Sequence, residues 1–115
     1  MKFKPEDIQL YIDQVTDDRK TLLLQFRDRI MRLYPDAVLR ISYQILMFKR
    51  KTGWTAVGYR RDGVTLYTGH PRIILEFHAS HPEIKTGTGC INFKKDVPWE
   101  DVDRIIQYAM EAKKG

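Results

Sequence analysis

The amino-acid sequence predicts an α+β fold: a two-layer sandwich in which an antiparallel β meander carries N- and C-terminal helices packed on one face. Three observations support this prediction. Apolar residues recur at helical spacing up to Pro35, alternate with a period of two from Leu39, and return to helical spacing after Pro98. The length of 115 residues suits one domain, residues 1–115, with a core large enough to need no disulfide.

Two helices are expected before the strands. Pro5 suits the first position of a helix, and that helix carries an apolar stripe of Ile8, Tyr11, Ile12 and Val15. Thr16 is expected to cap a second helix. The apolar face of this second helix comprises Leu23, Phe26, Ile30 and Leu33, and Pro35 ends it.

Three antiparallel strands are predicted over residues 38–68. Residues 39–48 read as one long strand, with Leu39, Ile41, Tyr43, Ile45 and Met47 on the core face. A turn at 51–53 leads to a strand over 54–60, and Asp62-Gly63 is a hairpin signal before the strand over 64–68.

The rest of the chain predicts two helices and a short strand. Pro71 opens a helix that ends near Pro82, residues 90–94 form a strand, and Pro98 opens the last helix. The apolar face of that last helix contains Trp99, Val102, Ile105, Ile106 and Ala109.

Composition excludes several classes of protein. The single cysteine, Cys90, rules out an internal disulfide framework and a cysteine-cluster zinc site. The N-terminal residues are too charged for a signal peptide and no apolar run approaches a membrane span, so a cytoplasmic protein without a membrane partner is expected. No nucleophile–base pair is visible, and the expected function is not enzymatic.

The net charge of +5 arises in one segment, because residues 37–61 contain six basic and no acidic side chains. A basic segment of this kind indicates an anionic partner, such as nucleic acid. The alternative is that charge keeps strand ends and turns soluble. The candidate patch comprises Arg40, Lys49, Arg50, Lys51, Arg60 and Arg61.

An open sheet face is a natural place for a site, because aromatic side chains beside arginines can stack on single-stranded bases. Ordinary core packing is the alternative for at least half of these aromatic residues. The candidates are Ser42, Tyr43, Trp54, Tyr59 and Tyr67.

Two loop motifs have both a functional and a structural interpretation. Lys85-Thr86-Gly87-Thr88-Gly89 suggests an anion cradle, or a helix C-cap with both glycines at positive φ before a strand. His78 and His81, with His70 and Glu83 nearby, suggest a metal site, although three histidines in a chain of this size need no special explanation.

Two stretches resemble the YdhG-like family of small bacterial domains, mostly of unknown function. Ile41-Ser42-Tyr43 and Phe48 match its first motif, and Lys85-Thr86-Gly87, Gly89, Ile91 and Phe93 match its second. The family is similar in layout to frataxins, and some members are described as intracellular iron chaperones. The resemblance therefore implies a frataxin-like layout and the handling of iron.

The carboxylates of Asp13, Asp17 and Asp18 are the candidate iron ligands, because hard cations prefer charged oxygen donors. The chain departs from the family at Gln44-Ile45-Leu46, where the family has Gly-Met-Pro. Without that glycine and proline, the strand is expected to run straighter.

The sequence thus predicts a small intracellular binding domain that acts on iron or another metal, as the resemblance implies. The alternative is an anion or nucleic-acid binding module that uses the basic segment and the open sheet face. Its partner would be a small ligand, a metal, a protein or a nucleic acid, and it would act as a monomer or a dimer.

Overall fold

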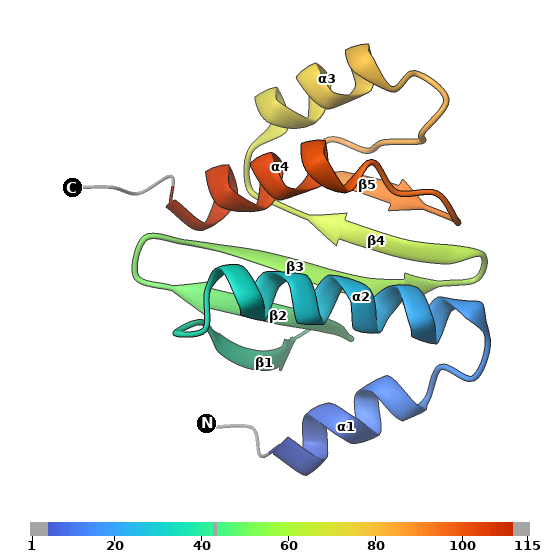
Figure 1. Ribbon diagram of the computed structural model, residues 1–115, viewed down its shortest axis with the longest axis vertical. Helices are drawn as coiled ribbons and strands as arrows, with labels where there is room; N and C mark the ends of the chain where they lie inside the picture. Colours follow the sequence, from blue (N-terminus) through green and yellow to red (C-terminus); the bar gives the residue numbers. More distant parts are fainter. Residues whose placement is uncertain (1–4, 43, 112–115) are drawn as a thin grey trace.

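The computed structural model describes residues 5–42 and 44–111 and confirms the α+β two-layer sandwich (Figure 1). The elements along the chain are α1 (Pro5–Asp13), α2 (Asp18–Leu33), β1 (Val38–Ser42), β2 (Ile45–Arg50), β3 (Gly53–Arg60), β4 (Gly63–Tyr67), α3 (Pro71–Ser80), β5 (Cys90–Phe93) and α4 (Trp99–Glu111).

The strands form one antiparallel sheet in the order β1-β2-β3-β4-β5. Helices α2 and α4 lie over one face of this sheet, α1 packs on the same side at its β1 edge, and α3 lies beyond its β5 edge (Figure 1). Fully buried side chains from both layers form the core between them. They include Leu23, Phe26, Ile30, Leu46, Phe48, Val57, Leu66 and Ile106.

The expected long strand over residues 39–48 is wrong, because the chain reverses there and residues 38–68 form four strands. Ser42 pairs with Ile45 across a two-residue connection, and Gln44 adopts a left-handed φ of 64°. The expectation of a straighter strand at Gln44-Ile45-Leu46, where the family has Gly-Met-Pro, is therefore also wrong, because the chain turns back at Gln44. The hydroxyl of Tyr11 donates to the Gln44 carbonyl at 2.9 Å, and burial raises the pKa of Tyr11, so this donor keeps its proton.

The reversal also changes which side chains reach the core. The register pairs Ile41 with Leu46 and Leu39 with Phe48, so these side chains share the helix-covered face. Leu46 and Phe48 are fully buried there, whereas Ile45 and Met47 point to the opposite face and are half-buried. The expectation that Ile45 and Met47 face the core is therefore wrong.

Three smaller features also differ from expectation. Asp17, and not Thr16, caps α2, because its carboxylate accepts a hydrogen bond from the Arg19 amide. The hairpin between β3 and β4 pairs Arg60 with Gly63, so residues 61 and 62 form its turn. Neither Gly87 nor Gly89 has a positive φ.

None of the helices within the described residues combines the length and the apolar character that a membrane crossing needs.

Neighbouring alanine substitutions in β2 test the side-chain orientation. Leu46→Ala leaves a cavity in the core, so we expect it to lower the free energy of unfolding by about 3 kcal/mol. Met47→Ala removes a half-buried side chain on the other face, and we expect a loss of about 1 kcal/mol or less. Urea unfolding of both variants measures the difference. A larger loss of unfolding free energy for Met47→Ala than for Leu46→Ala would contradict the reversal and support the single long strand.

A glycine substitution tests the turn. Gln44 holds a left-handed φ that glycine adopts without a steric cost, so we expect Gln44→Gly to raise the free energy of unfolding by about 0.5 kcal/mol. Gln25→Gly in the exposed middle of α2 is the control, and it should lower the free energy of unfolding by about 1 kcal/mol. Equal losses for the two variants would contradict the reversal at Gln44.

Candidate functional site

The sheet face opposite α1, α2 and α4, here called the open face, is the largest surface of the sheet without a helix on it (Figure 1). The strand register places neighbouring side chains on it in rows. One row runs from Arg40 through Met47, Ala56 and Tyr67 to Cys90. The next contains Ser42, Ile45, Gly58, Thr65 and Asn92.

Small buried residues form the centre of the open face, and larger apolar side chains lie around them. Ala56, Gly58 and Thr65 are buried, and a Cβ atom added at Gly58 would meet Ile45 at 2.8 Å and the Tyr67 ring at 3.6 Å. Ile45 and Tyr67 therefore approach each other over Gly58. The result is a shallow apolar surface that half-buries its aromatic side chains.

Two of the candidate aromatic residues lie on this face. Tyr67 and Trp54 are half-buried there, and the Trp54 indole lies against Gly69. Tyr59 lies on the helix-covered face instead, where its ring centroid is 5.5 Å from that of Tyr11 and its hydroxyl donates to Gln14. Ser42 is on the open face, and Tyr43 lies outside the described residues.

The open face is basic, because none of the strands, all within the described part of the chain, contains an acidic residue. The structure divides the candidate patch between the two ends of β3. Lys49 pairs with Trp54 near the start of β3, and Arg60 ends the same strand. Six residues of extended chain separate these ends by about 20 Å.

At the first end, Arg40, Lys49 and Lys51 line a hollow of about 660 Å³ beside Val38. These three cations make no ion pair with any described residue. Arg50 and Asp36 line the same hollow but are paired with each other at 3.1 Å, and Arg50 lies over the Tyr34 ring at 4.5 Å. We name Arg40, Lys49 and Lys51 the β1–β2 cations.

At the other end, Arg60 lies with three lysines that the basic segment does not include. A hollow of about 500 Å³ is lined there by Arg60, Lys85, Lys94 and Lys95, together with Asp62, Glu83 and Asp96. The antiparallel pairing of β4 with β5 brings them together. Arg61 is exposed in the neighbouring turn. Because β5 is separated from β4 by a helix and a loop, local sequence pattern does not predict this grouping.

Two of the three candidate iron ligands, Asp13 and Asp17, are paired with neighbouring cations. Asp13 accepts hydrogen bonds from Lys20 and Gln9, both at 2.9 Å, and the bond from Lys20 lowers the pKa of that carboxyl. Asp17 caps α2 and accepts from Arg19, which lowers its pKa. Asp18 is exposed in the first turn of α2. Within residues 5–42 and 44–111, no three His, Cys, Asp or Glu side chains gather closely enough to hold a metal ion.

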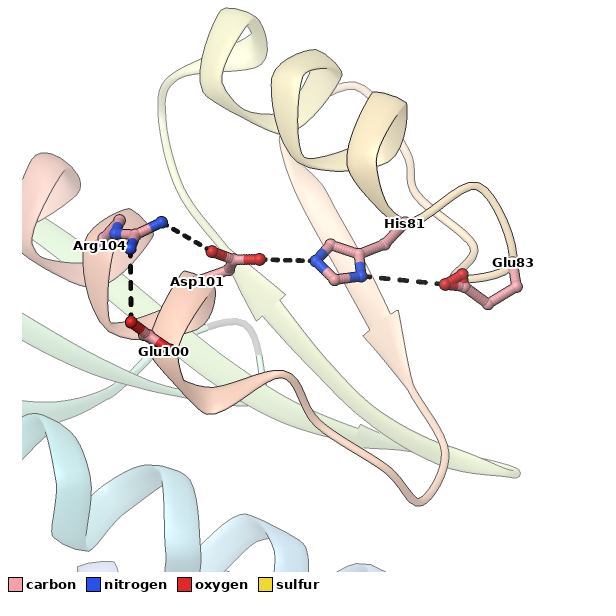
Figure 2. Close-up of polar contacts among 5 residues, drawn as sticks. All are labelled: His81, Glu83, Glu100, Asp101 and Arg104. Carbon is pink, nitrogen blue, oxygen red and sulfur yellow. Dashed lines mark hydrogen bonds and ion pairs between the residues drawn. The ribbon is translucent and has the colours of Figure 1, made fainter.

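Each of the three histidines contacts different neighbours, so they do not form one cluster. His78 bonds the Ile84 carbonyl, and the His70 ring meets Tyr108 edge-on. His81 connects the end of α3 to α4, because its Nε2 lies 2.7 Å from Asp101 and its Nδ1 lies 3.8 Å from Glu83 (Figure 2).

Arg104 contacts the other oxygen of Asp101 at 2.9 Å, so the whole cluster of Figure 2 is internally paired. Ser80 precedes His81 in a position that could suggest a nucleophile. Both imidazole nitrogens already face carboxylates, which leaves neither directed to a serine as general base. The cluster joins α3 to α4.

The second family motif folds back along β5. The backbone N–H of Asn92 donates to the Lys85 carbonyl, and the backbone N–H of Gly87 donates to the Cys90 carbonyl. Thr86 pairs with Ile91. This loop covers the outer edge of β5. A Cβ atom added at Gly89 would lie 2.8 Å from the Thr68 carbonyl oxygen, so glycine is needed there for close approach. Phe93 of this motif and Phe48 of the first lie in the core.

No protein-family model, curated protein or solved structure matches this chain. The resemblance to the YdhG-like family, and the iron handling that it implies, stay predictions.

Proposed function

We propose that this chain is a non-enzymatic binding domain that holds single-stranded nucleic acid across the open face. One observation carries the proposal: half-buried Trp54 and Tyr67 lie between two groups of cations on a sheet face whose strands, all within the described residues, contain no acidic residue. Aromatic side chains on a sheet stack unpaired bases, and cations beside them bind the phosphates.

The geometry favours a single strand over a duplex. Bases of a duplex are stacked inside it and cannot reach aromatic side chains that are themselves half-buried on a shallow surface. A single strand can turn its bases to Trp54 and Tyr67 while its phosphates reach the β1–β2 cations and Arg60. The separation of about 20 Å between these groups spans several nucleotides, at the small end of known single-strand sites.

Charge distinguishes this partner from a second copy of the chain. Two open faces brought together would place Arg40, Lys49 and Arg60 of one copy against the same cations of the other. The strands of the sheet offer no carboxylate within the described residues to neutralise them. Of the acidic residues that line the two hollows, Asp36 already pairs with Arg50 and Asp62 with Lys94. Like charges across an interface disfavour association, whereas a polyanion releases condensed counterions on binding.

The iron hypothesis is not carried into this proposal. Binding of iron by Asp13 and Asp17 would require them to give up Lys20 and Arg19, to which they are already bonded.

Salt dependence tests the proposal. A fluorescent oligonucleotide of about ten nucleotides is titrated with protein between about 50 and 200 mM salt, and anisotropy is measured. Affinity should fall steeply with salt. Lys49→Gln/Lys51→Gln should reduce the slope of log K against log salt by about 1.4, because each contacted phosphate contributes about 0.7 for a single strand.

A matched variant controls for total charge. Arg32→Gln/Arg72→Gln removes two exposed cations from the helices and should leave the slope nearly unchanged. Tyr67→Leu keeps an apolar side chain but removes stacking, and it should weaken binding about tenfold at every salt concentration. Absence of binding at about 50 mM salt would refute the proposal. If the two double variants reduced the salt slope equally, the open face would not be the binding surface. Dimers found at the same concentrations would favour a second copy as the occupant.

A further inference from the structure

The hollow at the Arg60 end of the open face combines apolar and polar lining residues. Val64, Ile84 and Phe93 provide its apolar part, and its volume of about 500 Å³ is typical of a small-ligand site. Two of its lining residues, Arg60 and Asn92, lie on the open face, whereas Val64 and Phe93 lie on the helix-covered face. The hollow therefore lies at the end of the sheet and borders the surface on which we place the nucleic acid.

Several side chains with hydrogen-bond donors line this hollow. The Asn92 side-chain oxygen accepts from both Arg60 at 2.6 Å and Thr65 at 2.7 Å, which directs the Asn92 amide nitrogen away from them. That NH₂ group has no partner among the described residues, and Lys85 and Lys95 make no ion pair there. A half-buried amide donor, two lysines and the remaining N–H groups of Arg60 suit an anion with several oxygens.

Three carboxylates, those of Asp62, Glu83 and Asp96, line the same hollow. Asp62 pairs with Lys94 at 3.5 Å, and Glu83 faces the His81 ring at 3.8 Å. Asp62, Glu83 and Asp96 are exposed, as are the lysines that line the same hollow. A nucleic-acid chain that continued past the hollow would bring further phosphates against these carboxylates. A chain that ends in the hollow brings only one phosphate group.

We infer, resting on the proposed function, that this hollow binds the terminal phosphate of the single strand. A terminal phosphate monoester carries nearly two negative charges and three free oxygens, against one charge for a phosphate within the chain. It therefore gains more than an internal phosphate from the donors of Arg60, Lys85, Asn92 and Lys95 that line the hollow. The carboxylates of the hollow then set the direction, because they oppose any extension of the chain past it.

Competition among oligonucleotides tests this inference. One sequence is prepared with a 5′-phosphate, with a 3′-phosphate and with hydroxyl groups at both ends. A fourth oligonucleotide, longer by two nucleotides, has hydroxyl ends and carries at least the charge that the terminal phosphate adds. We expect one phosphorylated form to bind about tenfold more tightly than the longer oligonucleotide. Lys85→Gln/Lys95→Gln should reduce this preference to less than about twofold, and inorganic phosphate in excess should abolish it.

The control variant is Lys49→Gln/Lys51→Gln at the opposite end of the face, which should weaken all four oligonucleotides equally and keep the preference. Equal affinity of the phosphorylated oligonucleotides and the longer one would overturn the inference and leave the proposed function standing. Binding of inorganic phosphate without any preference among the oligonucleotides would assign the hollow to a free phosphate and also overturn it. Absence of binding by every oligonucleotide would overturn both. The lysines concerned are exposed, and thermal unfolding of each variant checks that the fold is retained.

Discussion

The reversal of the chain between Ser42 and Ile45 decides which side chains of β1 and β2 reach the core and which reach the open face. It is held by the Tyr11 hydroxyl, which reaches from α1 to the Gln44 carbonyl. Without the reversal, Leu46 and Phe48 would leave the core, and Met47 and Lys49 would leave the open face. Both the packing of the helices and the composition of the candidate site therefore depend on one left-handed residue.

One-sided coverage of the sheet supplies the second condition for a binding surface. The apolar faces of α2 and α4 are used on a single face of the sheet, so the opposite face must limit its exposed apolar area by other means. It does so with small central residues, Ala56 and Gly58, and with side chains that lie flat over them. The same arrangement leaves Trp54 and Tyr67 half-buried, with cations at both ends of β3 and no carboxylate on the strands.

Much of this could be predicted from the sequence, because periodicity and proline positions are local signals. They predicted α3 from Pro71, β5 and the apolar face of α4. The reversal between Ser42 and Ile45 was not predicted, because glutamine is not a residue typical of the left-handed φ that Gln44 adopts. The grouping of Arg60 with Lys85, Lys94 and Lys95 was not predicted for a different reason. It depends on the pairing of β4 with β5 across more than twenty intervening residues, which no local pattern encodes.

The two tryptophans allow the most direct test of the central claim. Trp54 lies on the open face, whereas Trp99 lies on the helix-covered side, with its ring 4.9 Å from that of Phe26 and the Arg29 guanidinium 4.8 Å from its centroid. Their indole N–H groups give separate signals in a ¹H–¹⁵N correlation spectrum. On titration with a single-stranded oligonucleotide, the account predicts that the Trp54 signal shifts and the Trp99 signal stays. A shift of Trp99 with Trp54 unchanged, or no shift of either at saturation, would contradict it.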